Sequence, residues 1–144
     1  MKIHLATDHA GFEHKESLKA HLLEKGHEVT DHGAKTLNET DDYPAIITLA
    51  VKAVLDDPSS KAIVFGGSGE GEAMVANRFK GIRAAVYYGG NTDILVFSRA
   101  HNDANILSLE ARFLTGEEVN ESADIWLETE FSGEQRHIRR LAQF

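Results

Sequence analysis

The chain has 144 residues, a formal net charge of -8, 42% hydrophobic residues and no cysteine. This length suits one domain with its own core, and the acidic balance argues against nucleic-acid binding, which depends on Lys and Arg neutralising phosphates. The missing cysteines exclude disulfides, thiolate metal ligands and a cysteine nucleophile. The first residues are too short an apolar run for a signal peptide, and no apolar stretch reaches the length of a membrane span. We therefore expect residues 1–144 to form one cytoplasmic domain with neither a nucleic acid nor a membrane as partner.

Short apolar runs alternate with amphipathic segments along the whole chain. Strands are expected at 3–7, 28–31, 61–65, 82–87 and 105–109, and helices at 12–25, 43–55, 72–79, 92–101, 117–128 and 135–142. Gly26 is a suitable cap for the end of the first helix, and Pro44 favours the start of the second. Alternating strands and helices indicate βαβ units. The predicted fold is α/β: a single Rossmann-like α/β/α sandwich with a central parallel sheet of about five strands.

Polar segments follow several of the predicted strands. They include Asp8-His9, Gly66–Glu72, the loop after Tyr87 and the residues from Leu109 to Arg112. In open α/β sheets, ligands bind beyond the carboxyl ends of the strands. We therefore expect these four segments to meet at one edge of the sheet.

The most informative of these segments is Gly66-Gly67-Ser68-Gly69-Glu70-Gly71-Glu72. Glycines allow backbone N–H groups to approach a ligand oxygen, and a helix that starts just afterwards adds its positive end. The segment could bind a phosphate or the oxyanion of an enediolate, or it could be a glycine-rich turn without a ligand. A dinucleotide site is less well supported, because the glycines follow the third strand and their spacing is not G-x-G-x-x-G.

Several ionisable residues admit both a chemical and a structural role. Glu72 could be a catalytic base or a solvated glutamate of a first helical turn. His101, beside Asn102, could be an acid or base or a turn residue. Arg136 and Arg140 share a helix face and could clamp a phosphate, or simply complement the helix dipole. No His or carboxylate spacing typical of a metal site is present, so no metal is expected.

Taken together, several segments resemble the family of ribose-5-phosphate isomerase type B and galactose-6-phosphate isomerase. They occur in family order over nearly the whole chain: Thr7-Asp8-His9-Ala10-Gly11-Phe12, Asp42-Tyr43-Pro44, Gly67-Ser68-Gly69-Glu70-Gly71, Ala76-Asn77, Gly81-Ile82-Arg83-Ala84, His101-Asn102-Asp103-Ala104-Asn105, and Arg136-His137 with Arg140. Each segment alone is a weak indication, but the ordered set is specific. The resemblance implies a homodimer or a tetramer of such dimers, with active sites at the dimer interface and no cofactor.

The resemblance also implies roles for individual residues. Asp8 and His9 would contact the substrate, and Tyr43 would help to bind the sugar or open its ring. His101, with Asn102 beside it, would open the furanose. The backbone of Gly67, Gly69, Glu70 and Gly71 would stabilise the enediolate oxygen. The phosphate would be held by Arg112, Arg136, His137 and Arg140.

One position departs from the common family pattern. Many members have a cysteine base just before the glycine loop, where this chain has Gly66. In a subgroup with Gly-Gly-Ser-Gly followed by Gly-Glu, the glutamate takes that role. The resemblance therefore implies that Glu72 moves the proton between C1 and C2, that Ser68 helps to position the base or a substrate hydroxyl, and that ribose 5-phosphate and ribulose 5-phosphate interconvert through a cis-enediolate.

Two alternatives remain open at this stage. The residues from Tyr87 to Thr92 differ from those usual in the family. The substrate could therefore be another sugar phosphate: a tetrose 4-phosphate, allose 6-phosphate or galactose 6-phosphate. The chain could also be a non-catalytic subunit that binds a sugar phosphate.

Overall fold

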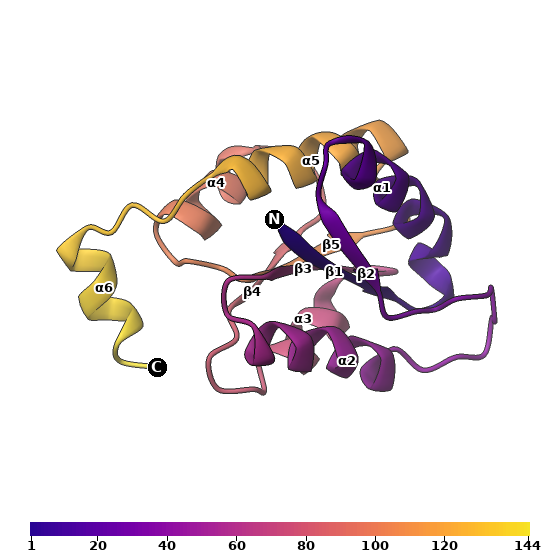
Figure 1. The fold of residues 1–144 in the computed structure, drawn as a ribbon, viewed down its shortest axis with the longest axis horizontal. Coiled ribbons are helices and arrows are strands. Elements are labelled where there is room, and N and C mark those ends of the chain that lie inside the picture. Colours follow the sequence, from indigo (N-terminus) through magenta and orange to yellow (C-terminus); the bar gives the residue numbers. More distant parts are fainter.

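A five-stranded parallel sheet forms the centre of the computed structural model, which describes residues 1–144 (Figure 1). The strand order is β2-β1-β3-β5-β4, with bounds β1 Lys2–Thr7, β2 Glu28–Asp31, β3 Lys61–Gly66, β4 Ala84–Tyr87 and β5 Ile106–Glu110. The helices are α1 Phe12–Glu24, α2 Tyr43–Asp56, α3 Glu70–Ala76, α4 Asp93–Ala100, α5 Gly116–Glu128 and α6 Gln135–Leu141, and a 3-10 turn, η1, covers His9–Gly11. The predicted α/β sandwich is thereby confirmed.

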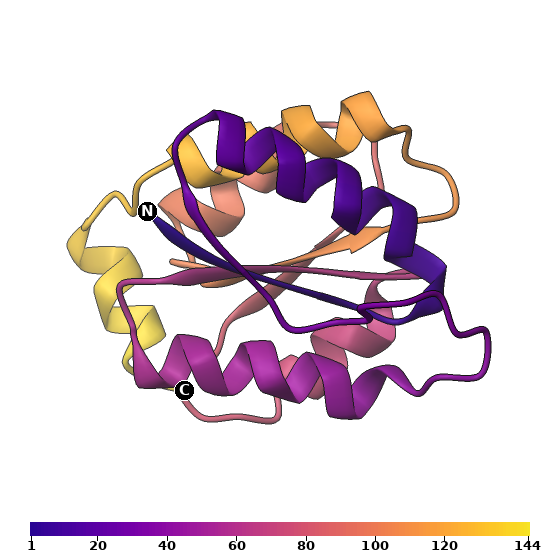
Figure 2. The same cartoon turned by 45° about the vertical axis from the view of Figure 1, so that its right-hand side comes forward.

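Helices cover both faces of the sheet. Figures 1 and 2 show α1, α4 and α5 on one face and α2 and α3 on the other. Each face has its own apolar core, because successive strand residues point to opposite sides: Leu5 and Phe65 pack with Trp126 on the first face, and Val64 packs with Val51 on the second. None of the helices is long and apolar enough to cross a membrane.

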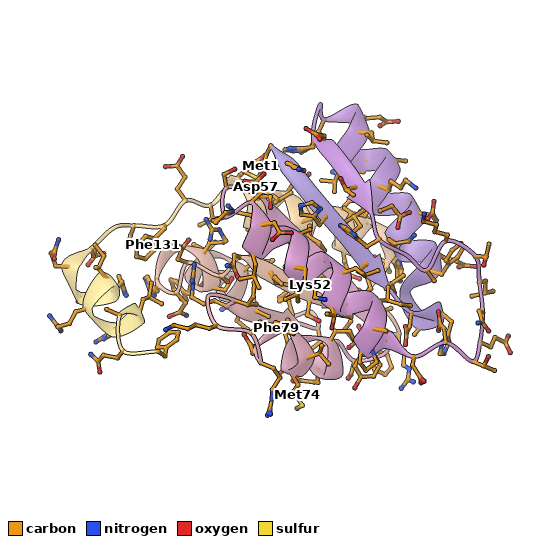
Figure 3. The ribbon with its side chains drawn as sticks, turned by 60° about the horizontal axis from the view of Figure 1, so that its bottom comes forward. Met1, Lys52, Asp57, Met74, Phe79 and Phe131 are labelled. Atoms are coloured by element: carbon orange, nitrogen blue, oxygen red, sulfur yellow. The ribbon has the colours of Figure 1, made fainter.

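The last helix lies at the periphery of this sandwich and contacts it through His137, whose ring stacks on that of His101. Figure 1 shows α6 beyond the amino ends of the strands, at the end of an extended connection that carries Phe131 (Figure 3). Its residues are exposed except for His137 and the half-buried Leu141. The helix thus presents most of its surface away from its own chain.

Three local features differ from the sequence-based expectation. Helix α3 covers Glu70–Ala76 rather than 72–79: it begins early because Gly69 adopts a left-handed conformation (φ 76°) and serves as its N-cap, and it ends three residues early, with Asn77 as its C-cap. Strand β4 begins at Ala84, two residues later than expected. The turn η1 was not anticipated; the Asp8 carboxylate caps it by accepting a hydrogen bond from the Ala10 N–H.

Asn77, from the Ala76-Asn77 segment of the family resemblance, binds the backbone of strand β4. The Asn77 side-chain amide donates to the Ala84 carbonyl (3.0 Å) and accepts from the Ala84 N–H (2.8 Å). Strand β4 is an edge strand, and unpaired edge groups are prone to pairing with another chain. Asn77 therefore occupies backbone groups of this edge as a further strand would.

A buried ion pair fixes β2 against α1. The Lys15 ammonium, fully buried, donates to both oxygens of Asp31 (2.8 and 2.7 Å) and to the Ala34 carbonyl, and Lys19 adds a further bond to Asp31. Burial alone would raise the pKa of Asp31, but the hydrogen bonds from Lys15, Lys19 and the Gly33 N–H outweigh it and lower this pKa to about 2. The pair anchors the start of the segment that leads to α2.

Substituting Asp31→Asn is expected to lower the free energy of unfolding by about 2 kcal/mol or more at pH 7, because it removes the more buried of the two carboxylates that pair with the buried Lys15 and leaves only the exposed Glu16. A depressed carboxyl pKa stabilises the fold above the unfolded value of 3.8, and this contribution is lost as pH falls toward about 2. The difference between wild type and variant should therefore shrink over that interval, as measured by urea unfolding at several pH values.

The matched control is Glu16→Gln, which removes the exposed partner of the same lysine and should cost less than about 1 kcal/mol. Equal losses in the two variants, or a difference that does not depend on pH, would contradict this account.

Candidate active site

A pocket of about 370 Å³ opens at the carboxyl ends of β1 and β3. Its lining comes from four separate parts of the chain: Asp8, His9, Ala10, Tyr43, Gly67, Ser68, Gly71, Glu72 and Arg112. All of these except Ala10 are candidates from the sequence. The parallel topology brings them together, because residues that follow parallel strands meet at the same edge of the sheet.

The Glu72 side chain lies beneath the end of β3. It is only 4% exposed, and a Cβ added to Gly66 would overlap its carboxylate. Burial raises the pKa of Glu72; its own backbone N–H opposes this shift, and the nearby negative charge of Asp8 adds to it. Glu72 is therefore a desolvated carboxylate in the space of a missing side chain, and not the solvated helix-end residue that local sequence rules favour.

Two other pocket side chains also rest on glycines. The Tyr43 hydroxyl would lie 2.6 Å from a Cβ on Gly71, and the Arg112 guanidinium would lie 3.0 Å from a Cβ on Gly67. The first contact would require a shift, and the second is tighter than ordinary packing. The glycines thus let a phenol and a guanidinium lie directly against the backbone of the loop.

The glycine loop is held from the core side of the sheet. The buried Ser108 hydroxyl on β5 donates to the Gly69 carbonyl (2.6 Å). The Ser68 hydroxyl accepts from the Glu70 N–H (3.3 Å) within the loop. Gly69 and Glu70 do not line the pocket: Gly69 is buried, and the exposed Glu70 lies with Met74 on the other side of α3, where Met74 points outward (Figure 3).

His9 is oriented by a residue that sequence analysis missed. Its Nδ1 lies 2.8 Å from Asp41 Oδ1, and its backbone N–H donates to the same oxygen. This hydrogen bond raises the pKa of His9. Asp41 lies 32 positions away in an irregular segment, so no spacing rule could have paired the two. With Nδ1 engaged, Nε2 is the nitrogen that can meet a ligand.

Asp8, His9 and Asp41 also form the chain's one compact group of possible metal ligands, with ligand atoms within 4.8 Å of one another. The His9 Nδ1 lies 2.8 Å from Asp41 Oδ1, so a contact within this group orients the His9 ring.

The remaining candidates lie at the opposite, amino-terminal edge of the sheet. They are His101, Asn102, Arg136, His137 and Arg140, and they follow α4 or belong to α6. The His101 imidazole stacks between the rings of Phe97 (4.8 Å) and His137 (4.4 Å). Burial, together with the charges of His101 and Arg136, lowers the pKa of His137. Within one chain, the structure does not bring this group to the Glu72 pocket.

Comparison with known proteins agrees with the family resemblance of the sequence. The model of the Ribose/Galactose Isomerase family matches residues 3–144. The chain therefore belongs to this family.

Two relatives and two solved structures illustrate the similarity. Ribose-5-phosphate isomerase B of Mycolicibacterium paratuberculosis is 39% identical over 141 residues, covering 98% of this chain and 87% of the relative. The Escherichia coli protein of the same name is 36% identical over 140 residues, covering 97% and 91%. The crystal structure of a ribose 5-phosphate isomerase from Thermotoga maritima shares 40% identity with a TM-score of 0.91, covering 99% of this chain and 95% of that one. The enzyme from Mycoplasma genitalium with bound ribulose-5-phosphate has 33% identity and a TM-score of 0.93, covering 99% and 92%.

Gly66→Ala is expected to displace the Glu72 carboxylate, because the new methyl group would occupy its place. If the pocket holds the catalytic base, kcat for a sugar phosphate should fall by about a hundredfold, since small displacements of a reacting group carry such penalties. Gly116→Ala is the matched control, because its nearest neighbour lies 4.0 Å from the added atom. Full activity in the Gly66 variant would show that the carboxylate position is unimportant.

Proposed function

We propose that this protein is an aldose–ketose isomerase that interconverts ribose 5-phosphate and ribulose 5-phosphate in the cytoplasm, without a metal or organic cofactor, and that residues 1–144 act as a single domain. The observation that carries the proposal is the desolvated Glu72 carboxylate in a glycine-lined pocket. Support comes from the chain's family and from its relatives, several of which are named ribose-5-phosphate isomerase B.

The reaction moves a proton between neighbouring carbons. Glu72 takes the proton from C2 of the open aldose, and the electron pair of that C–H bond passes through C1–C2 to the oxygen on C1. The resulting cis-enediolate receives the same proton at C1, while the hydroxyl proton on O2 is transferred to O1. A carboxylate with a raised pKa suits both steps, because its basicity lies nearer the working pH.

The rest of the pocket provides charge stabilisation and orientation. Backbone N–H groups of the loop at Gly67 and Gly71 are suited to the developing enediolate oxygen. Arg112 and the Nε2 of His9 are suited to the phosphate, and Asp8 and Tyr43 to the sugar hydroxyls. Holding both ends of the substrate keeps C1 and C2 near Glu72.

The group at the amino edge requires a second copy of the chain. Ring opening by His101, and phosphate binding by Arg136, His137 and Arg140, would need these residues to face the Glu72 pocket of a partner in a two-fold dimer. The peripheral position of α6 and its exposed arginines support this arrangement (Figure 1). The proposed assembly is a homodimer, or a tetramer of such dimers.

Glu72→Gln is expected to reduce kcat by at least about a hundredfold, because the amide cannot accept the proton. The assay would compare ribose 5-phosphate, erythrose 4-phosphate, allose 6-phosphate and galactose 6-phosphate in the presence of EDTA. Glu70→Gln is the matched control, an exposed glutamate two residues away, and should retain wild-type activity. Preference of the wild type for another sugar would correct the substrate, and absence of turnover on every sugar would contradict the enzymatic proposal.

Shared active sites make a distinct prediction for mixed subunits. Glu72→Gln and His101→Asn should each be inactive alone, yet refolding the two together in equal amounts should restore about a quarter of wild-type activity. Half of the dimers would be mixed, and one of the two sites in each would be intact. No recovery, despite mixed dimers detected by native mass spectrometry, would place each complete site within one chain.

A further inference from the structure

Glu110, the last residue of β5, has a carboxylate buried at the carboxyl edge of the sheet, the edge at which the Glu72 pocket opens. It is 2% exposed and lies opposite Gly66 in the β3–β5 pairing. A buried carboxylate is costly unless hydrogen bonds replace its water. A negative charge at this edge also disfavours an anionic ligand, so its presence calls for a specific reason.

The hydrogen bonds of Glu110 all come from the loop that follows it. The backbone N–H groups of Arg112 and Phe113 donate to Oε1, the latter at 2.6 Å, and the N–H of Leu114 donates to Oε2 at 3.0 Å. Three consecutive amides therefore converge on one carboxylate, and bonds of this charge-assisted kind are strong. The loop is wrapped around the Glu110 side chain.

Little else holds this loop in place. The Phe113 side chain is 83% exposed, so its burial anchors nothing, while Leu114 is 6% exposed and packs in the core. The Ala111 N–H donates to the Gly66 carbonyl. Between these two anchors, the backbone at Arg112 and Phe113 depends on Glu110.

The Arg112 side chain leaves the loop toward the pocket and does not pair with Glu110. Its guanidinium lies over Gly67, and the arginine ion pairs of the chain involve Arg83, Arg99 and Arg136 instead. Glu110 thus uses the backbone of Arg112 and leaves its charge available to an anion.

We propose that Glu110 is a positioning residue that holds the Arg112 guanidinium over the glycine loop, where it binds the phosphate of the substrate. This inference rests on the proposed function for the identity of the anion. Among the pocket-lining residues, the Glu110 side chain forms a hydrogen bond only with Arg112, through its backbone N–H, and it forms no ion pair. Its effect on catalysis should therefore appear in substrate binding and pass through Arg112.

The test compares Glu110→Gln and Glu110→Asp with wild type, using kcat and KM for ribose 5-phosphate and calorimetric titration with inorganic phosphate. The isosteric amide cannot accept all three N–H bonds. We expect KM and the phosphate Kd to rise about tenfold, with kcat changed less than about twofold. The aspartate should recover part of the loss. Glu118→Gln is the matched control: its carboxylate accepts the Thr115 N–H in the α5 capping box but does not reach Arg112, so KM and Kd should not change.

An Arg112→Ala background separates positioning from general stability. Adding Glu110→Gln there should change the phosphate Kd by less than about twofold, because residues that act through one another are not additive. An equal loss in both backgrounds, or an unchanged phosphate Kd in a folded Glu110→Gln protein, would overturn the proposal.

Two readouts keep the test decisive. If the Glu110 variants do not fold, hydrogen exchange on the wild type decides: protected amides at Arg112 and Phe113 support the proposal, and exchange at the rate of an unstructured peptide overturns it. If wild type isomerises no sugar phosphate, the proposed function fails, while the phosphate titration still tests whether Glu110 acts through Arg112.

Discussion

The space beside residue 66, at the carboxyl end of β3, can hold only one side chain. The candidate site depends on whether residue 66 or residue 72 occupies it. Gly66 has no Cβ, so the carboxylate of Glu72 enters from the first turn of α3. The left-handed Gly69 starts that helix early enough to turn Glu72 back beneath the strand. Desolvation follows from this placement, and the raised pKa of Glu72 follows from desolvation. The absence of a side chain at Gly66 therefore determines both the position of the Glu72 carboxylate and the direction in which its pKa shifts.

Much of the fold could be predicted because its determinants are local. The apolar run at Ile3–Thr7, the Pro44 start of α2 and Gly26 after α1 each act within a few residues. The burial of Glu72 could not be predicted in this way, since a first-turn glutamate is ordinarily solvated, and only the family resemblance favoured it as a base. The pairing of His9 with Asp41 and the wrapping of the Arg112 loop around Glu110 lacked a recognisable signal, because each depends on a hydrogen bond to a side-chain carboxylate rather than on a periodic pattern.

The division of the candidate residues between the two edges of the sheet could have been predicted from the order of strands and helices in the sequence. In a parallel sheet, residues that directly follow a strand lie at the carboxyl edge, and residues that directly precede one lie at the amino edge. Asp8 follows β1 and Arg112 follows β5, whereas His101 and Asn102 precede β5. The same alternation that predicts the fold thus separates the residues around Glu72, proposed for proton transfer, from His101 and Asn102, proposed for ring opening. The alternation of strands and helices does not predict a surface through which a second copy of the chain would bring the two groups together. Such a surface depends on exposed side chains that follow no periodic pattern.

Charge within the pocket favours one orientation of the proposed sugar phosphate. The lining carries the carboxylates of Asp8 and Glu72, with Asp41 behind His9, and Arg112 is its only guanidinium. A phosphate near Glu72 would meet like charge in a partly desolvated site, where Coulomb interactions are stronger than in water. In the proposed reaction, the uncharged C1–C2 end of the sugar would approach Glu72 without this repulsion, while the phosphate would be drawn toward Arg112. The carboxylates would then contribute to orientation as well as to chemistry, and the net charge of -8 is compatible with an anionic substrate because the positive charge is local.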